Sequence, residues 1–290
     1  MNNKTIYALG YFDGVHCGHQ ALLAACAALS NSQNCQSGAV TFIGHPQQLI
    51  SGNGVCLITT PADRRKLLLA NVDSVVELDF TDDLRTMPWQ DFLNMLAEKY
   101  DAAGFVCGSD FRFGSKGEGT APLLQDYCQR NNFVCTVVPQ QYLDGIRISS
   151  THIRSLLETG NLTDANRFLG HAHILTGIVQ QGKQLGRTIG FPTANISYPD
   201  GLVKLPYGVY ACWAIVDGRA HYAVTNLGTC PTVSGENVTV ETHLLGFSGD
   251  LYGKEITLEF LNFLRPEKKF ENLAALQKQI AKDAEYFQSL

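Results

Sequence analysis

Short apolar runs and helical patterns alternate along the first half of the chain. The apolar runs are bounded by polar or turn-forming residues, which is typical of buried strands, and helical periodicity fills the segments between them. Strands are predicted at residues 5–9, 39–43, 75–78, 105–107 and 133–138. This alternation predicts an α/β fold with a parallel sheet and right-handed crossovers, so a ligand is expected at the carboxyl ends of the strands.

Three helices of the first half are placed by their end signals and apolar faces. One is expected over residues 20–29. A second begins at Thr60, where Pro61 suits the first turn and Asp63 completes the cap. A third helix carries three apolar residues on one face: Phe92, Leu93 and Leu96.

The pattern changes to β-rich segments separated by Gly and Pro from about residue 174. Strands are predicted at residues 208–216, 221–226, 238–244 and 255–260. Their spacing is typical of an antiparallel β-barrel. A closing helix with a periodic apolar face is expected to cover this barrel, through Leu273, Leu276, Ile280, Ala284 and Phe287.

A single helix over residues 155–169 is expected to connect the two halves. The domain boundary is therefore placed near Gly170, giving a first domain of residues 1–170 and a second of residues 171–290. A chain of 290 residues agrees with two domains of about 150 residues each.

Composition narrows the range of partners. The net charge is −5 and no run of Lys or Arg is longer than three residues, which argues against nucleic acid or an anionic membrane as the main partner. The start of the chain lacks the apolar core of a signal peptide, and no stretch approaches the roughly 20 apolar residues of a membrane helix. The nine cysteines include no C-x-x-C pair. We expect a cytoplasmic protein with reduced thiols, monomeric or weakly self-associating, that acts on small molecules.

A glycine-rich segment follows the first predicted strand and leads into the first predicted helix. It reads GYFDGVHCGH, from Gly10 to His19, with further glycines at Gly14 and Gly18. Glycines allow close approach of a ligand, a helix N-terminus attracts anions, and the imidazoles of His16 and His19 add hydrogen-bond donors. The segment is suited to a triphosphate. Two alternatives stay open, a plain glycine-rich turn and a metal site that would include Cys17.

A second polar group lies at the start of the connecting helix and reads ISSTHIR. Hydroxyls and N–H groups here either cap the helix or bind an anion. Arg154 in the first turn opposes the helix dipole unless a negative ligand offsets it. The residues of interest are Ser149, Ser150, Thr151 and Arg154.

The second half contains a glycine-rich segment and one candidate base. Residues 182–195 read GKQLGRTIGFPTAN and lack the end of a P-loop, but Thr193 and Asn195 offer hard oxygen ligands for Mg²⁺ and a phosphate. A tight turn remains the alternative. Strand alternation places Glu241 opposite a face formed by Val238, Val240, Thr242 and Leu244, although a strand Glu is usually a solvated residue.

The first half resembles the nucleotidyltransferase superfamily through its H-x-G-H and S-S-T-x-I-R motifs. The sequence GSDFRFG, from Gly108 to Gly114, is similar to a segment of the bacterial FAD synthetase branch. The resemblance implies a Rossmann-like domain in which His16, His19 and Arg154 act on the ATP phosphates during transfer. It also implies nucleotide- or flavin-binding roles for Gly10, Phe12, Asp13, Gly14, Gly18, His45, Asp110, Ser149, Ser150 and Thr151.

The second half resembles riboflavin kinases through GFPTAN, and further matches follow in family order. They are Gly208-Val-Tyr210, Asn226-Leu-Gly228, Pro231-Thr232-Val233, Leu251-Tyr-Gly253 and Leu264-Arg-Pro-Glu267. The resemblance implies that Glu241 is the general base and that Thr193 and Asn195 hold Mg²⁺. Binding roles are implied for Gly182, Gly186, Gly190, Pro192, Thr193, Asn195 and Arg265.

The whole chain is thus similar to the bifunctional riboflavin kinase/FAD synthetase family, with ATP, Mg²⁺, riboflavin, FMN and FAD as the implied ligands. Four positions depart from the family pattern: Gly44, Gln47, Cys230 and Gly246. Gly44 replaces a proline and Gln47 an arginine, so a fixed positive charge is lost near the expected flavin phosphate. Cys230 stands where an arginine is common in the family, and Gly246 where an aspartate is common. Two further hypotheses are a kinase with an impaired or differently specific first domain, and a flavin-binding regulator without catalysis.

Overall fold

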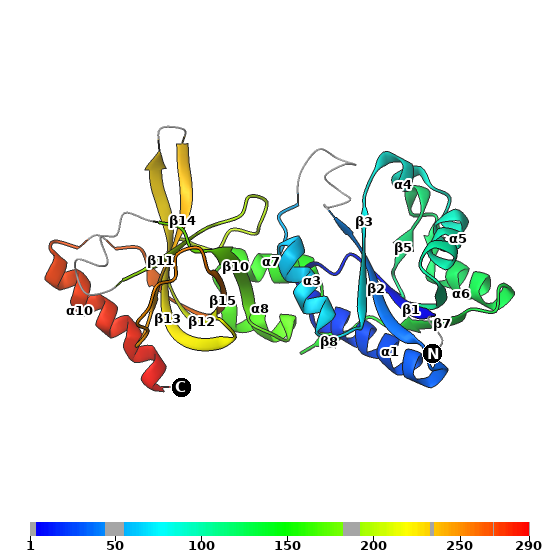
Figure 1. Cartoon of the computed structure of the whole chain (residues 1–290), viewed down its shortest axis with the longest axis horizontal. Helices are drawn as coiled ribbons and strands as arrows, with labels where there is room; N and C mark the ends of the chain where they lie inside the picture. Colours follow the sequence, from blue (N-terminus) through cyan, green and yellow to red (C-terminus); the bar gives the residue numbers. More distant parts are fainter. Residues whose placement is uncertain (1–3, 44–54, 182–191, 233–234, 269, 290) are drawn as a thin grey trace. The chain divides into compact units, whose positions relative to one another are not determined.

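The computed structural model describes residues 4–43, 55–181, 192–232, 235–268 and 270–289 (Figure 1). The chain forms two compact units. The first unit comprises residues 1–57 and 61–150, and the second comprises residues 58–60 and 151–290. Among the described residues, no helix is long and apolar enough to cross a membrane. The assignment of one activity to residues 1–170 and another to 171–290 stays a prediction.

A parallel sheet of five strands forms the centre of the first unit, in the order β3–β2–β1–β4–β7. All five predicted strands are confirmed. β2 and β4 begin earlier than predicted, because pairing with β1 extends them through small or polar residues that an apolar pattern does not mark. The strands are β1 (Thr5–Leu9), β2 (Gln36–Ile43), β3 (Ser74–Asp79), β4 (Ala102–Gly108) and β7 (Val134–Val138).

Helices cover both faces of this sheet, and alternate residues of β1 enter two different cores. Ile6 and Ala8 pack with the helices of one face, whereas Tyr7 and Leu9 pack with those of the other. The first face carries α1 (Cys17–Gln33) and α3 (Pro61–Leu69), and the second carries α5 (Trp89–Lys99) and α6 (Ala121–Arg130). The predicted apolar face of α5 is confirmed as buried. The sequence had not indicated α6 or the short α4 (Asp82–Thr86).

The first helix starts before the predicted residue 20. His16 is its N-cap, and the Nδ1 atom of this histidine accepts a hydrogen bond from the backbone N–H of His19 at 3.3 Å. Caps are usually Ser, Thr, Asp or Asn, so the sequence does not mark this start. The helix ends before Asn34, which adopts a left-handed conformation with φ of 53°.

Two short hairpins lie at the edge of the first unit. One joins β5 (Arg112–Phe113) to β6 (Gly119–Thr120), and the other joins β8 (Tyr142–Leu143) to β9 (Ile146–Arg147). The second turns at Asp144 and Gly145, whose φ angles are 52° and 78°. Positive φ at both positions is the geometry for which Asp-Gly is favoured in a two-residue hairpin.

The prediction of one helix over residues 155–169 is wrong. The structure has two helices, α7 (Ser150–Glu158) and α8 (Leu162–Leu169). Gly160 between them has φ of 75°, and the Oδ1 atom of Asn161 caps α8 by accepting from the N–H of Asp164 at 3.3 Å. A glycine in the left-handed region ends one helix and an Asn caps the next. These two residues break the helix, although the helical spacing of apolar residues continues across them.

The second unit contains the predicted antiparallel barrel. Its six strands lie in the order β10–β15–β12–β13–β14–β11. Just beyond β10, the N–H of Gln180 donates to the carbonyl of Asn195 in β11 at 2.8 Å, which brings the two edge strands together. The strands are β10 (His173–Ile178), β11 (Ala194–Ser197), β12 (Gly208–Val216), β13 (Arg219–Thr232), β14 (Gly235–Leu244) and β15 (Glu255–Pro266).

Apolar side chains and a few satisfied polar groups fill the barrel. Tyr210 and Phe260 are fully buried, with their rings edge to face at 5.4 Å between centroids. Thr225 and Thr242 are also buried and share a hydrogen bond of 3.0 Å between their hydroxyls. This pairing removes the cost of burying two unsatisfied hydroxyl groups.

The predicted C-terminal helix is confirmed as α10 (Leu273–Ala284), which is followed by the 3₁₀ segment η3 (Glu285–Ser289). Phe287 is buried against Val209, Ala211 and Val224, so the end of the chain covers part of the outer barrel face (Figure 1). The side chains of Leu273 and Leu276 lie outside the described part of the structure.

Candidate active sites

The glycine-rich loop of the first unit has a strained backbone. It passes from β1 to α1 through the 3₁₀ segment η1 (Asp13–Val15). Phe12 has φ of 59° and Val15 has φ of 40°, values that are costly for these side chains and that cluster at functional sites. Both residues are buried. At Gly10, an added Cβ would lie 3.0 Å from the Phe12 ring, so glycine permits this fold of the loop.

The two predicted histidines come together at the start of α1. Their rings are stacked, with centroids 3.6 Å apart and an angle of 13° between the planes. The edge of Phe12 meets His19 at 5.2 Å between centroids. A Cβ on Gly18 would approach the His16 ring at 3.2 Å, so glycine at this position leaves room for the imidazole.

Electrostatics favour a neutral His19. Burial lowers the pKa of His19 well below its ordinary value, and the neighbouring His16 and Arg64 lower it further. A neutral imidazole can donate one hydrogen bond and accept another. Burial raises the pKa of the nearby Cys17 thiol, which disfavours the thiolate that a cysteine nucleophile would need.

A cavity of about 250 Å³ opens beside these histidines. It brings together six of the predicted site residues and several residues that the sequence did not single out. The predicted ones are His16, Gly18, His19, Asp110, Ser149 and Ser150. Ser150 also links this surface to the loop, because its hydroxyl donates to the carbonyl of Asp13 at 3.1 Å.

Arg147 is a residue of this cavity that sequence reasoning missed. It forms an ion pair and a hydrogen bond with Asp110, across 37 positions of sequence. The Asp-Gly pair at residues 144 and 145 is a sequence signal for a hairpin, and it could have indicated that Arg147 lies on a strand leading directly into the Ser149-Ser150 segment. Thr151 and Arg154 belong to the second unit and are not among the described residues that line the cavity, so their ATP-binding roles stay predictions.

A second cavity of the first unit, of about 220 Å³, is strongly aromatic. Its walls come from segments at or beyond the carboxyl ends of β2, β3 and β4. Phe111 and Phe113 are stacked at 5.5 Å between centroids, and Phe42 meets Phe80 edge to face at 5.4 Å. The lining residues are Phe42, Phe80, Leu84, Arg85, Phe92, Phe111, Arg112, Phe113, Gly114 and Gly117. An aromatic wall with two arginines suits a planar, anionic ligand.

Glu241 lies in a row of polar residues on the outer face of the barrel. It is directly opposite Asn195 of β11 on one side and Asn226 of β13 on the other. Directly opposed residues of antiparallel strands share one face at about 5 Å between Cβ atoms. The predicted alternation is confirmed, because Val240 and Thr242 are buried while Glu241 is exposed. One carboxylate is thus flanked by two amides.

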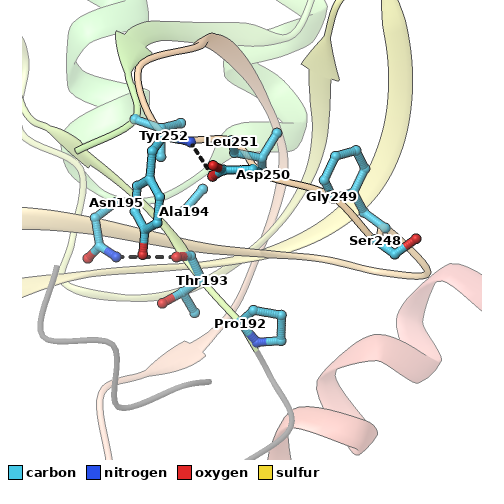
Figure 2. A pocket seen from close by; sticks show the side chains of 11 residues that line it. Pro192, Thr193, Ala194, Asn195, Ser248, Gly249, Asp250, Leu251 and Tyr252 are labelled. Atoms are coloured by element: carbon cyan, nitrogen blue, oxygen red, sulfur yellow. Dashed lines mark hydrogen bonds between the residues drawn. The ribbon is translucent and has the colours of Figure 1, made fainter. Parts of the chain in front are cut away.

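Thr193 and Asn195 come together at a cavity of about 280 Å³ (Figure 2). The side-chain amide of Asn195 donates to the carbonyl of Thr193 at 3.4 Å. The opposite wall is the loop after β14, where the carboxylate of Asp250 accepts from the N–H of Tyr252 at 3.0 Å. Pro192 also lines this cavity. Tyr252 belongs to the Leu251-Tyr-Gly253 match, whereas Asp250, directly before it, is a site residue that the sequence did not single out.

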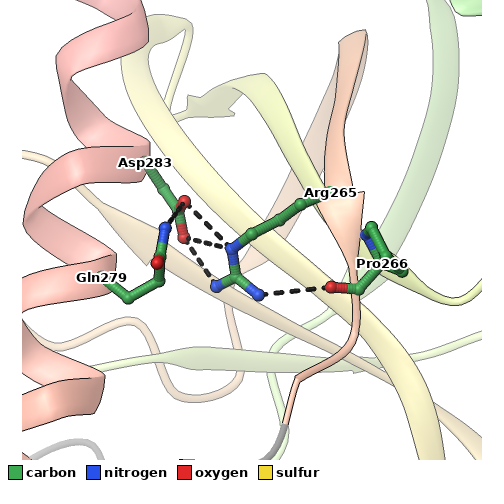
Figure 3. Close-up of polar contacts among 4 residues, drawn as sticks. All are labelled: Arg265, Pro266, Gln279 and Asp283. Carbon is green, nitrogen blue, oxygen red and sulfur yellow. Dashed lines mark hydrogen bonds and ion pairs between the residues drawn. The ribbon is translucent and has the colours of Figure 1, made fainter.

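Arg265 is engaged within the chain (Figure 3). Its Nε donates to both carboxylate oxygens of Asp283 in α10, at 3.0 and 3.1 Å, and its Nη2 donates to one of them at 2.7 Å. Gln279 donates to the same carboxylate at 2.9 Å. This arginine therefore fastens α10 to β15, and a direct role in flavin binding stays a prediction.

Some predicted positions lie outside the described residues. They are Gly44, His45, Gln47, Gly182, Gly186 and Gly190, together with the side chain of Cys230. Gly246 is described: its φ is 68°, and no atom lies within 4 Å of an added Cβ. Its backbone conformation favours glycine, and Asp is among the residues that tolerate it.

The fold and the sites together define a class of protein. One unit has a glycine-rich loop, suited to binding phosphate, at the carboxyl end of a parallel sheet. The other has the carboxylate of Glu241 and the side-chain oxygens of Thr193 and Asn195 on a barrel. This is the arrangement of a two-domain transferase that acts on phosphorylated small molecules.

Comparison with known proteins gives the family. Residues 1–152 match the family model described as FAD synthetase, and residues 169–290 match the one described as riboflavin kinase. A bifunctional riboflavin kinase/FMN adenylyltransferase of Listeria monocytogenes is 33% identical over 96% of this chain and 90% of its own length. The protein of that name in Escherichia coli K12 is 35% identical over the same shares.

A solved structure is similar over the whole chain. The crystal structure of a protein described as a macrolide-efflux protein, from Streptococcus pneumoniae, has a TM-score of 0.86 and 29% identity, and the match covers 100% of this chain and 95% of that one. The chain belongs to the family of bifunctional riboflavin kinase/FMN adenylyltransferases. The family predicted from the sequence is confirmed.

Proposed function

We propose that each half of this enzyme performs one of the two reactions named for its family. The second unit transfers the γ-phosphoryl group of ATP to riboflavin, giving FMN and ADP. The first unit transfers AMP from a second ATP to FMN, giving FAD and pyrophosphate. The observation that carries this proposal is that each half matches one family model and contains a polar site of its own.

In the kinase reaction, Glu241 accepts the proton of the terminal ribityl hydroxyl as that oxygen attacks the γ-phosphorus of ATP. The bond between the γ-phosphorus and the bridging oxygen breaks, and ADP leaves. Asn195 and Asn226 lie directly opposite Glu241 on the two neighbouring strands, so polar side chains border its carboxylate on both sides. The exposure of Glu241 agrees with this role, because a base must reach a substrate that arrives from solvent.

The oxygen donors at the nearby cavity fit Mg²⁺ in type. Thr193 offers a hydroxyl, Asn195 an amide oxygen and Asp250 a carboxylate, and all three line the same cavity. We assign Thr193 and Asn195 as the residues that hold the metal, with Asp250 as a further donor. A bound Mg²⁺ would neutralise charge on the ATP phosphates.

In adenylyl transfer, a phosphate oxygen of FMN attacks the α-phosphorus of ATP, and pyrophosphate leaves with the electron pair of the broken bond. The reaction needs positioning and charge stabilisation rather than a protein nucleophile. His16 and His19 donate to the phosphates at the start of α1, and Ser149 and Ser150 add donors in the same cavity. Thr151 and Arg154 are assigned to the β- and γ-phosphates.

The aromatic cavity of the first unit is assigned to the isoalloxazine ring of FMN. Stacked Phe111 and Phe113 offer planar contacts, and Arg112 lies beside them for the anionic part of the ligand. Aromatic stacking discriminates a flat ring system by shape and area. The enzyme is assigned to the cytoplasm, with riboflavin, FMN and ATP as its small-molecule partners.

Two other functions are not favoured. A non-catalytic regulator would bind flavin without needing Glu241, which the chain retains at the position the family match requires. Efflux is named for the Streptococcus structure, whereas neither family model that matches this chain describes it.

A time course from riboflavin tests both reactions together. Purified protein with riboflavin, ATP and Mg²⁺ should form FMN first and FAD afterwards, with ADP and pyrophosphate as the respective by-products. Formation of FMN without FAD would contradict the adenylyltransferase assignment. If neither flavin product formed, the whole proposal would be wrong.

A further inference from the structure

Arg64 is a fully buried arginine in the first turn of α3 with few partners. Its exposed fraction is 0%, and its Nη2 donates to the carbonyl of Phe42 at 2.5 Å. Its guanidinium carbon lies 4.6 Å above the centre of the Tyr11 ring. Among the described residues, its Nε and Nη1 atoms have no hydrogen-bond partner.

Such a group is costly unless an anion meets it. Arginine stays charged in proteins, and a buried charge normally pairs with a carboxylate or another acceptor. Within the described part of the chain, the recorded contacts of Arg64 are one carbonyl and one aromatic ring. Two buried N–H-bearing nitrogens, Nε and Nη1, are thus left available on a rigid cation, and guanidinium N–H groups are donors suited to a phosphate.

Arg64 lies next to residues of both cavities of the first unit, although it is not among the lining residues of either. Its hydrogen-bond acceptor, Phe42, lines the aromatic cavity assigned to the flavin ring. Its charge also acts on His19, which lines the cavity assigned to the ATP phosphates. In adenylyl transfer, the phosphate of FMN must lie between its own ring and the α-phosphorus of ATP.

We propose that Arg64 is a catalytic residue of adenylyl transfer that binds the FMN phosphate and stabilises the charge between the two substrates as the new P–O–P bond forms. The proposal rests on the assignment of adenylyl transfer to the first unit. Arg64 keeps its proton throughout; the FMN oxygen gains the bond to the α-phosphorus, and pyrophosphate leaves.

The neighbouring arginine provides a matched control. Arg65 is 46% exposed and pairs with Glu77 at 2.9 Å on the surface of the same helix. We compare Arg64→Gln with Arg65→Gln in the full chain, measuring FAD formation from FMN and ATP and, separately, FMN formation from riboflavin. For Arg64→Gln we expect kcat/KM for FMN to fall roughly 100-fold or more, as when one transition-state donor is removed. Riboflavin kinase activity should be retained in both variants, which shows that the second unit is intact, and lumiflavin binding reports whether the first unit still folds.

A second measurement separates phosphate binding from support of the flavin cavity. Lumiflavin has the ring system but neither the ribityl chain nor the phosphate, so it serves as a competitive inhibitor that cannot be phosphorylated. The proposal predicts that Arg64→Gln raises KM for FMN while the inhibition constant of lumiflavin changes less than about threefold. Arg64→Lys should recover part of the rate, because it restores the charge but not the planar donor pair.

Three outcomes would overturn the role of Arg64. They are a kcat/KM for FMN in Arg64→Gln equal to that in Arg65→Gln, an equal weakening of FMN and lumiflavin, and no recovery in Arg64→Lys. Failure of the unaltered chain to form FAD would instead overturn the adenylyltransferase assignment, and the role of Arg64 with it.

Discussion

The two candidate sites of this chain are built in opposite ways. In the first unit, the site is a strained loop, with positive φ at Phe12 and Val15, and its cavity is lined by residues far apart in sequence. In the second unit, Asn195, Glu241 and Asn226 occupy regular register positions on three neighbouring strands. The positions of the side chains in the first site depend on how a loop packs. In the second site they depend on the alternation of side chains along paired strands.

The difference matches the chemistry that each site is assigned. Adenylyl transfer needs fixed charge and hydrogen-bond donors, and the first unit provides the partly buried His19 and the fully buried Arg64. Transfer to a sugar hydroxyl needs a base, and the second unit presents an exposed carboxylate. If this comparison is right, each site can be disabled without affecting the other.

The largest effect is expected for Glu241→Gln. The amide keeps the shape of the side chain but cannot accept the hydroxyl proton, so FMN formation should slow by about 10² to 10⁴-fold. The rate of FAD formation from added FMN should stay within about twofold. Initial rates of the two reactions, measured separately on the same preparation, check this. An unchanged rate of FMN formation would contradict the assignment of Glu241 as the base.

The reciprocal change is His19→Ala. Loss of one donor to the ATP phosphates should slow FAD formation by about 10² to 10³-fold. FMN formation by the second unit should be retained. The rate of pyrophosphate release from FMN and ATP measures the first effect, and ADP release from riboflavin and ATP measures the second. An equal loss of both activities would indicate one shared site and would break the comparison.

The contrast between the sites also explains what the sequence could predict. Strand alternation depends only on neighbours along the chain, so the parallel sheet, the barrel strands and the buried face beside Glu241 could be predicted from periodicity. The aromatic cavity could not, because Phe42, Phe80 and Phe111 meet only after three strands and their loops have been placed. Each of these residues by itself looks like part of a core.

Local signals outside the usual rules account for other differences. The start of α1 was missed because a histidine caps it, and the break between α7 and α8 because apolar spacing continues across Gly160. Arg64 looks in sequence like the exposed Arg65 next to it. Only burial and, among the described residues, the unpartnered Nε and Nη1 atoms of Arg64 distinguish the two.

A stability effect is expected where α10 is fastened to the barrel. Asp283 is 5% exposed and accepts three hydrogen bonds from Arg265, so Asp283→Ala leaves a largely buried guanidinium unpaired. We expect a loss of about 3 kcal/mol in the free energy of unfolding. The surface pair of Asp217 and Lys254, at 2.6 Å, is the control, and Asp217→Ala should cost less than about 1 kcal/mol. Urea unfolding measures both, and equal losses would contradict the structural role of Arg265.

A pH effect on stability is expected from the barrel. Burial lowers the pKa of His173 from 6.5 to about 3, so between these values the unfolded chain binds a proton that the folded chain does not. Stability should therefore fall as pH decreases through this range, by about 2 kcal/mol from this group between pH 7 and pH 5. In His173→Leu this part of the pH dependence should disappear. The free energy of unfolding in urea is measured at pH 7 and pH 5 for the unaltered chain and for His173→Leu. The same loss between the two pH values in both proteins would contradict the role of His173.

The smallest effect is expected at Gly246, where the family commonly has Asp. Because φ is 68° and no atom lies within 4 Å of an added Cβ, Gly246→Asp has room and meets only a conformational cost. Asp tolerates the left-handed region better than most residues, so the loss should be below about 1 kcal/mol. FMN formation should change less than about twofold, since the departure at Gly246 leaves Glu241, Thr193 and Asn195 in place. A large gain in kinase rate would instead mean that this loop carries part of the reaction, and that strand register alone does not define the second site.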